Sequence, residues 1–308
     1  MANNLFEYDE SKFYQQLFKD FNKTKEDLNG FINIMRKWAE TQKHFPEKPN
    51  VNLLRFVILY NKFSIEAAKQ KLDMFYTVRN LMPEFFQENP LTEKMILQRK
   101  IWYMVPLPKL ADDHVRIIYQ KLNPKYADPK YFIHEHMGVQ FIQLLTLIAE
   151  NDSSYRMHYI FDCECLKLGH AAKASLMVLR KSQIVMEKVF STRIASLYAV
   201  NLPAYLENFF NTVLKPTLIP KLRERLQIHT GNEILFEIFG KERMPRDIGG
   251  EEKSLDEIND MLDQQYELHK DRFLELEKLT VDESLRPDKL QNDEILGYYG
   301  NFRKVNFD

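Results

Sequence analysis

The sequence has little of what several common classes of protein require. It holds nine glycines in 308 residues and contains neither a GxGxxG nor a GxxxxGK[ST] motif. Phosphate-binding loops depend on such glycines, so a nucleotide-dependent enzyme is not expected. The formal net charge is -1, and no overall basic character therefore favours nucleic acid as a partner.

Cysteine is also scarce. The two cysteines, Cys163 and Cys165, lie too close in the chain for a useful structural bridge. Such usage is typical of a reducing, cytoplasmic setting. With His158 and His170 the pair is the best metal candidate in the sequence, but a structural zinc site needs its four ligands at looser pair spacing. Two ordinary buried thiols are the better interpretation, and we expect neither a metal nor a cofactor.

Long apolar runs are missing as well. The longest strongly apolar stretch, residues 141–149, is interrupted by Gln143 and Thr146 and is too short to cross a bilayer. The first residues, MANNLFEYDE, resemble neither a secretion signal nor a myristoylation site. We therefore expect no transmembrane segment, and any membrane association should be peripheral and transient.

The first part of the chain has the pattern of a series of amphipathic helices. Apolar residues at helical spacing predict helices over residues 13–21, 28–38 and 53–61. Ser64 is placed to cap the next helix. Residues 1–104 are therefore predicted to form an N-terminal all-helical bundle.

Beyond residue 105 the pattern changes to alternating strands and helices, which predicts an α/β fold with a mostly parallel sheet flanked by helices. This second domain should cover residues 105–275, followed by a C-terminal tail at 276–308. A fifth strand is expected near the four that the pattern identifies. The predicted strands cover residues 115–119, 157–162, 194–200 and 226–230, and the predicted helices cover residues 134–150, with a surface-exposed start, and 171–190.

Residues 193–225 carry most of the functional information. A strand predicted to be buried on both faces leads into residues 204–214, where apolar residues recur at helical spacing. Lys215-Pro216 is expected to end this helix, and the basic residues Lys221, Arg223 and Arg225 follow. The helix either packs against an ordinary core or forms a movable lid over an apolar cavity.

Catalytic machinery is less evident. Asp162 ends a predicted strand, where α/β enzymes often place a carboxylate. Because no nucleophile or partner is evident nearby, a hydrogen-bonded structural role is favoured. We therefore expect a protein that is not an enzyme.

Ordered motifs across residues 50–250 resemble the CRAL-TRIO lipid-binding family, and within it the tocopherol-transfer and retinaldehyde-binding branch. Leucine-rich residues 53–56 with Lys62-Phe63-Ser64 and Ala67-Ala68 are similar to the family's helical pre-domain motif. In the second domain the similar positions are Asp162 of a D.EG turn, Asn201 and Pro203 of N.P, Lys215-Pro216, and residues 244–250 of an LP.EYGG turn.

The resemblance implies an apolar cavity beneath a gate helix and transfer of one lipid without chemistry. The ligand-binding positions that it implies are Tyr119, Gln143, Phe161, Val185, Met186, Ile194, Leu197, Phe209, Phe210, Val213, Leu214 and Leu218. The phosphoinositide-binding positions that it implies are Arg193, Lys221 and Arg225, while a fourth is Ala195 here.

The chain also departs from the family pattern. Cys165 and Leu166 replace the glycine and tryptophan of the D.EG turn, and Val139 and Gln143 replace two serines near the head group. Between Asn201 and Lys215 the chain is one residue longer than the usual pattern.

Three functions remain open. We expect first a cytoplasmic carrier of one hydrophobic molecule, tocopherol before a retinoid, that delivers it to phosphoinositide-containing membranes. The alternative within the superfamily is a phosphatidylinositol-binding transfer protein or trafficking regulator. The third is an adaptor whose acidic residues 251–308 recruit a partner.

Overall fold

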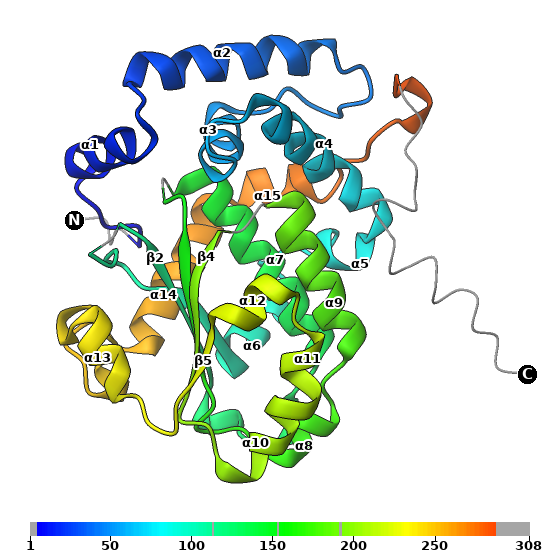
Figure 1. Cartoon of the computed structure of the whole chain (residues 1–308). Helices are drawn as coiled ribbons and strands as arrows, with labels where there is room; N and C mark the ends of the chain where they lie inside the picture. The colour runs from blue at the N-terminus through cyan, green and yellow to red at the C-terminus, as the bar shows by residue number, and fades with distance from the viewer. Residues whose placement is uncertain (1–4, 113, 153, 191–192, 288–308) are drawn as a thin grey trace, which may run out of the picture.

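The computed structural model describes residues 5–112, 114–152, 154–190 and 193–287, and its N-terminal part is helical, as predicted (Figure 1). A capping box closes α2, since Asp27 N–H donates to Thr24 Oγ1 and Thr24 N–H to Asp27 Oδ2. Ser64 Oγ accepts the N–H of Ala67 and caps α4, as expected. The helices are α1 (Glu10–Phe21), α2 (Lys25–Thr41), α3 (Val51–Tyr60), α4 (Ile65–Leu81), α5 (Pro83–Phe86) and α6 (Glu93–Ile101).

The described residues of the second part form a five-stranded sheet in the order β1-β2-β3-β4-β5. β1 pairs antiparallel with β2 and the other neighbours pair parallel, which confirms the mostly parallel α/β prediction. The expected fifth strand is β1, and the predicted domain boundary at 104/105 falls inside it. The strands are β1 (Trp102–Pro106), β2 (Arg116–Leu122), β3 (Met157–Asp162), β4 (Ile194–Val200) and β5 (Leu226–Ile228).

The helices that connect the parallel strands lie on one side of the sheet (Figure 1). Because successive strands are neighbours in one direction, crossovers of the same hand place every connecting helix on the same face. The opposite face is covered by α13 (Glu233–Phe239) and α14 (Leu255–Leu268), which is followed by α15 (Lys270–Leu276). The connections are α7 (His134–Asn151), α8 (Leu168–Ala172) with α9 (Leu176–Ile184), and residues 204–225.

Two helix predictions need correction. The helix expected over 171–190 is broken, because Ser175 caps α9 through Val178 N–H and its own N–H is bonded to His134 Nδ1. The α-helix also ends at Ile184 and continues as the π-helical turn η3 (Val185–Val189).

The helix expected to end at Lys215-Pro216 instead runs through Thr217. It consists of η4 (Ala204–Leu206), α10 (Glu207–Phe209), the π-helical turn η5 (Phe210–Leu214) and α11 (Lys215–Thr217). Pro216 has no N–H to donate to the preceding turn, yet the helix continues past it to Thr217. We call residues 204–217 the covering segment; α12 (Pro220–Arg225) follows it.

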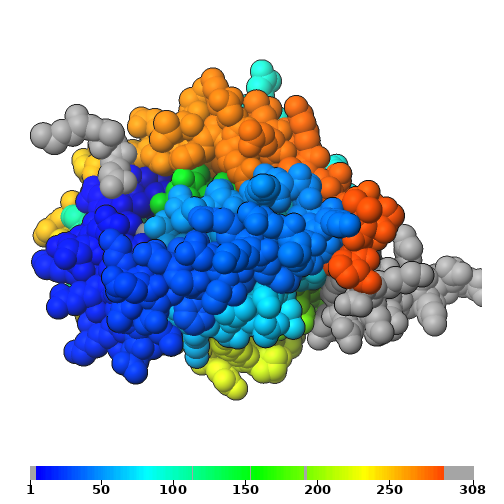
Figure 2. All heavy atoms as spheres, turned by 90° about the horizontal axis from the view of Figure 1, so that it is seen from above, coloured from blue at the N-terminus to red at the C-terminus, as the bar shows by residue number. Residues whose placement is uncertain are grey.

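Buried and partly buried ion pairs join the parts of the chain. Arg116 and Asp152 are fully buried and make two contacts of 2.9 and 3.2 Å. Arg272 of α15 donates at 2.7 Å to each carboxylate oxygen of Glu47 and at 2.8 Å to Glu150 of α7. Seen from above, α14 and α15 flank the N-terminal helices, in accord with this connection (Figure 2).

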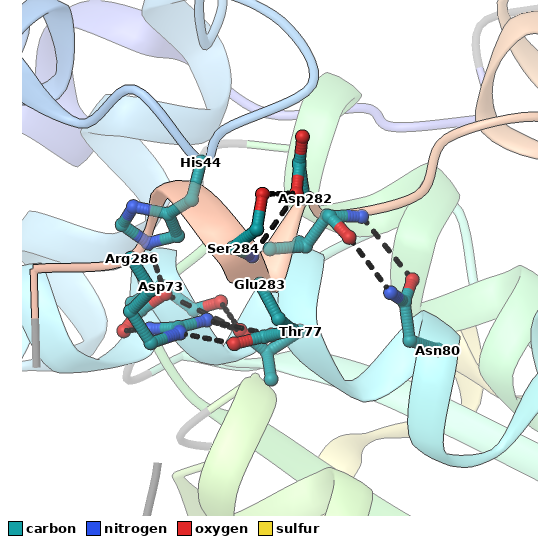
Figure 3. Close-up of polar contacts among 9 residues, drawn as sticks. His44, Asp73, Thr77, Asn80, Asp282, Glu283, Ser284 and Arg286 are labelled. Carbon is teal, nitrogen blue, oxygen red and sulfur yellow. Dashed lines mark hydrogen bonds and ion pairs between the residues drawn. The ribbon is translucent and has the colours of Figure 1, made fainter. Parts of the chain in front are cut away.

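The described part of the predicted C-terminal tail is docked on α4 (Figure 3). Arg286 donates to Asp73 Oδ2 at 2.6 Å and to Thr77 Oγ1 at 2.7 Å. The amide of Asn80 exchanges hydrogen bonds of 3.0 and 3.2 Å with the backbone of Val281. Residues 281–286 therefore belong to the folded unit, while residues 288–308 of the tail lie outside the described part.

Candidate functional site

An apolar cavity of about 250 Å³ lies between one face of the sheet and the helices that cover it. Alternate strand residues share a face, and the cavity side chains follow this period of two except between Ile194 and Leu197, where the register with β3 shifts. The opposite set, which includes Tyr119 and Asp162, faces α13 and α14. The strand residues on the cavity wall are Trp102, Met104, Gln120, Tyr159, Phe161, Ile194, Leu197, Ala199 and Leu226.

The wall opposite the sheet is supplied by α7, by residues 166–186 and by the covering segment. Gly138 of α7 permits close packing there, because a Cβ would lie 2.6 Å from the Phe85 ring. At the start of the covering segment, Tyr205 Oη donates to the Leu166 carbonyl at 2.6 Å. The covering segment and the residues after it contribute Leu206, Phe209, Phe210, Leu214, Leu218 and Leu222.

Most of the predicted ligand-binding residues line the cavity. They are Phe161, Met186, Ile194, Leu197, Phe209, Phe210, Leu214 and Leu218. Three others lie elsewhere: Tyr119 points to the other sheet face, Gln143 donates to the Glu88 carbonyl, and Val185 is buried in η3. Their role as ligand contacts stays a prediction.

Val213 is the fourth predicted residue outside the cavity wall, and η5 explains its position. A π-helical turn closes i→i+5 bonds and so accommodates one residue more than an α-helical turn. This π-helical turn, Phe210–Leu214, lies within the part of the chain that was predicted to be one residue longer than the family pattern. Leu214 consequently reaches the cavity while Val213 is half-buried beside it.

β4 is also less enclosed than predicted. Residues 195–197 are only partly buried, although Leu197 was expected in a strand buried on both faces. The short β5 pairs with only three residues of β4, from Leu197 to Ala199. This part of the sheet is therefore left beside the cavity and the neighbouring cleft, and does not lie within a packed core.

Histidines supply part of the polar lining. His134, predicted to lie on the surface, is buried against Phe132, and its Nδ1 accepts the N–H of Ser175 at 2.7 Å. His170 also lines the cavity. Burial lowers the pKa of both imidazoles, so both are neutral near pH 7. Among the described residues the lining contains no carboxylate and no thiol.

Asp162 has the structural role expected of it. Its carboxylate accepts hydrogen bonds from Tyr119 Oη at 2.7 Å and from Lys121 Nζ at 2.9 Å. Asn201 donates to it at 3.0 Å and has a φ of 52°, a left-handed conformation that asparagine tolerates. Burial disfavours the charge of Lys121, but Asp162 and Glu164 raise its pKa overall. This network fixes the ends of β2, β3 and β4 below the cavity.

The three predicted phosphoinositide residues, Arg193, Lys221 and Arg225, line one cleft of about 690 Å³ beside the cavity. Lys62 and Lys71 of the N-terminal part also line it, as does Glu187, and sequence reasoning did not identify these residues. Lys62 had one signal, as the basic residue of the pre-domain motif, and Lys71 had none. We call the hollow that holds Arg193, Lys221, Arg225, Lys62 and Lys71 the basic cleft.

The charges of the basic cleft act on one another. Burial and the neighbouring Arg225, Arg193 and Lys62 lower the pKa of Lys221. Burial, with Arg156 next, lowers the pKa of Arg193, whose Nη1 has no hydrogen-bond partner in the described part of the chain. A group of mutually repelling cations is stabilised by an anion, so the cleft is suited to a multiply charged anionic group.

One thin wall separates the cavity from the basic cleft. Gln183, Met186, Ile194 and Leu222 line both hollows. Gln183 crosses from α9 to the end of the covering segment, donating to the Thr217 carbonyl at 3.3 Å and accepting from Ile219 N–H at 3.0 Å. A change on either side of this wall therefore reaches the other directly.

The thiols are suited to neither catalysis nor metal binding. Burial raises the pKa of Cys163 and of Cys165, so both remain protonated. His158 is bonded to Ser196 Oγ on the other sheet face, away from His170. Within the described ranges we find no group of three or more potential metal ligands, and no helix there is long and apolar enough to span a membrane.

Two family models match parts of this chain. Residues 106–250 match the family model described as CRAL/TRIO domain, and residues 23–96 match one described as Pinta-like, UBA domain. A solved structure titled "Crystal structure of Sfh5" aligns at 12% identity and a TM-score of 0.49, over 88% of this chain and 100% of that chain. A search of curated proteins found no match.

Proposed function

Because residues 106–250 form a CRAL/TRIO domain, a lipid-binding module, we propose that this protein carries one hydrophobic molecule and delivers it to phosphoinositide-containing membranes. The cavity holds the cargo and the covering segment acts as its gate. Burying about 400–600 Å² of apolar ligand surface is worth on the order of 10 kcal/mol before binding costs. Transfer of this kind needs no chemical step.

The observation that carries the proposal is the wall shared by the cavity and the basic cleft. A phosphoinositide head group bound by Arg193, Lys221 and Arg225 would lie against Gln183, which holds the end of the covering segment. Cationic residues near an anionic surface contribute about 1 kcal/mol each, which suits brief docking and no permanent anchoring. The membrane lipid would thus loosen the gate where it binds.

Fluorescent tocopherol transfer to vesicles with and without phosphoinositide tests this mechanism. Wild-type protein should transfer faster to the phosphoinositide vesicles, and the Arg193→Ala, Lys221→Ala, Arg225→Ala variant should lose that difference while still binding tocopherol. Lys241→Ala is the control, because this exposed lysine does not line the cleft or the cavity. An unchanged rate in the triple variant would overturn the mechanism.

For the cargo we propose tocopherol first and a retinoid second. The cavity has a volume of about 250 Å³, just below the ~300–1,000 Å³ of typical ligand pockets. Binding of tocopherol or a retinoid therefore requires the covering segment to move outward. Native mass spectrometry of lipid that copurifies with the protein identifies the cargo by its mass.

The basic cleft also favours a second candidate, phosphatidylinositol as the cargo itself. Its acyl chains would occupy the cavity and its head group the cleft, across the shared wall. A copurified mass of a phospholipid, retained by wild type and lost from the triple alanine variant, would support this function over the first.

A further inference from the structure

Two N–H groups on the cavity wall have no hydrogen-bond partner among the described residues: Trp102 Nε1 and His170 Nε2. Their side chains are almost wholly enclosed, since Trp102 is 2% exposed and His170 is 3% exposed. A buried polar group is normally hydrogen-bonded, and leaving one unpaired costs about 1–3 kcal/mol. Neither residue was among the predicted ligand contacts.

The proton on His170 can be assigned from its other nitrogen. Nδ1 accepts the backbone N–H of Lys167 at 2.8 Å, so it cannot itself carry hydrogen. Burial and the charge of Lys167 lower the pKa of the imidazole, which keeps it neutral near pH 7. His170 Nε2 is therefore a hydrogen-bond donor, like the indole N–H of Trp102.

The rings of Trp102 and His170 both pack against the ring of Phe132. The Phe132 ring centroid is 5.8 Å from that of Trp102 and 5.6 Å from that of His170. An aromatic ring is at best a weak acceptor, so Phe132 leaves both N–H groups poorly satisfied. This end of the cavity thus has an excess of donors beside an apolar surface.

We propose that Trp102 Nε1 and His170 Nε2 together bind a carbonyl oxygen on the cargo, an inference that rests on the proposed carrier function. A carbonyl oxygen offers two lone pairs and brings no hydrogen of its own. A hydroxyl would add a donor to a site that already has two. A carboxylate on the cargo would need a buried cation beside it. The lysine of the described cavity lining, Lys167, is exposed and does not supply one. The cargo class is therefore a hydrophobic ketone, aldehyde or ester, so of the two cargoes proposed above this site favours an aldehyde retinoid over tocopherol, whose hydroxyl brings a donor.

Displacement of Nile red from the full-length protein by two matched ligands tests this. 2-Tridecanone and 2-methyltridecane have the same carbon chain. At the second carbon the ketone carries an oxygen and the hydrocarbon carries a methyl group. Wild-type protein should bind the ketone at least tenfold more tightly. Trp102→Phe and His170→Asn should each reduce this preference severalfold, with little change in affinity for the hydrocarbon, which also reports correct folding.

His170→Asn and His170→Gln separate ligand binding from a structural role. Asparagine keeps an acceptor for Lys167 N–H at the position of Nδ1 but has no donor at the position of Nε2. Glutamine places a donor at the position of Nε2 but has no acceptor at that of Nδ1. Loss of ketone preference in His170→Asn, with retention in His170→Gln, supports the proposal, and the opposite pattern overturns it. Equal binding of both ligands by all proteins overturns the inference while the carrier function stands. Binding of neither ligand and no Nile red uptake refutes the carrier function itself.

Discussion

Gln183 fastens the end of the covering segment, and replacing it should accelerate cargo release. Gln183→Met keeps the volume of the side chain and removes both bonds to Thr217 and Ile219. In the open state water replaces these partners, so each bond is worth about 0.5–1.5 kcal/mol net. Two bonds give about 1–3 kcal/mol, which corresponds to roughly 5- to 150-fold faster opening.

Stopped-flow release of fluorescent tocopherol to acceptor vesicles without phosphoinositide measures this opening. Ser182→Ala is the control, because it also alters a cavity-lining residue of α9, and within the described residues Ser182 makes no hydrogen bond to the covering segment. We expect Gln183→Met to release cargo at least fivefold faster and Ser182→Ala to behave as wild type. If the two variants release cargo at the same rate, Gln183 does not hold the gate.

Three further outcomes follow from the contacts described above. Arg272→Met removes the bonds to Glu47 and Glu150 and should lower the free energy of unfolding by on the order of 2 kcal/mol in urea, whereas Glu275→Gln should change it little. Burial raises the pKa of Asp152, but the ion pair with Arg116 outweighs it and holds this pKa below its usual 3.8. The ionised carboxylate therefore stabilises the fold above about pH 4, and this stabilisation is lost as the pH falls through the lowered pKa. Asp152→Asn should therefore cost about 3–5 kcal/mol at pH 7 and flatten the acid limb of the stability curve; equal loss at pH 3 and pH 7 would contradict this assignment. The double variant Lys62→Ala, Lys71→Ala should bind phosphoinositide vesicles roughly tenfold or more weakly in a sedimentation assay, because each lysine contributes about 1 kcal/mol. Its binding to neutral vesicles should not change.

Much of the fold could be predicted from the sequence because its signals are local. β3 and β4 have the predicted bounds, since continuous apolar runs end at Asp162 and at Asn201. The break in the helix expected over 171–190 could not be foreseen, because the N–H of Ser175 is taken by His134, a residue distant in sequence. Likewise β1 became recognisable only through its antiparallel pairing with β2.

The site was predictable to the extent that motifs fixed the chain register. Arg193, Lys221 and Arg225 do share one cleft, but Lys62 and Lys71 join it through tertiary packing that no local pattern reveals. Tyr119 was assigned to the cavity although the strand period turns it toward Asp162. Trp102 and His170 could not be recognised because an unpartnered N–H is visible only once every neighbour is placed.

The shared wall of Gln183, Met186, Ile194 and Leu222 also has a thermodynamic consequence. Coupling between two binding equilibria is reciprocal. If a bound head group lowers the affinity for cargo by some factor, bound cargo lowers the affinity for the head group by the same factor. The loaded protein would then dissociate from the membrane more readily than the empty one. Emptied carriers would accumulate on the membrane, and reloading would be what frees them for the next cycle.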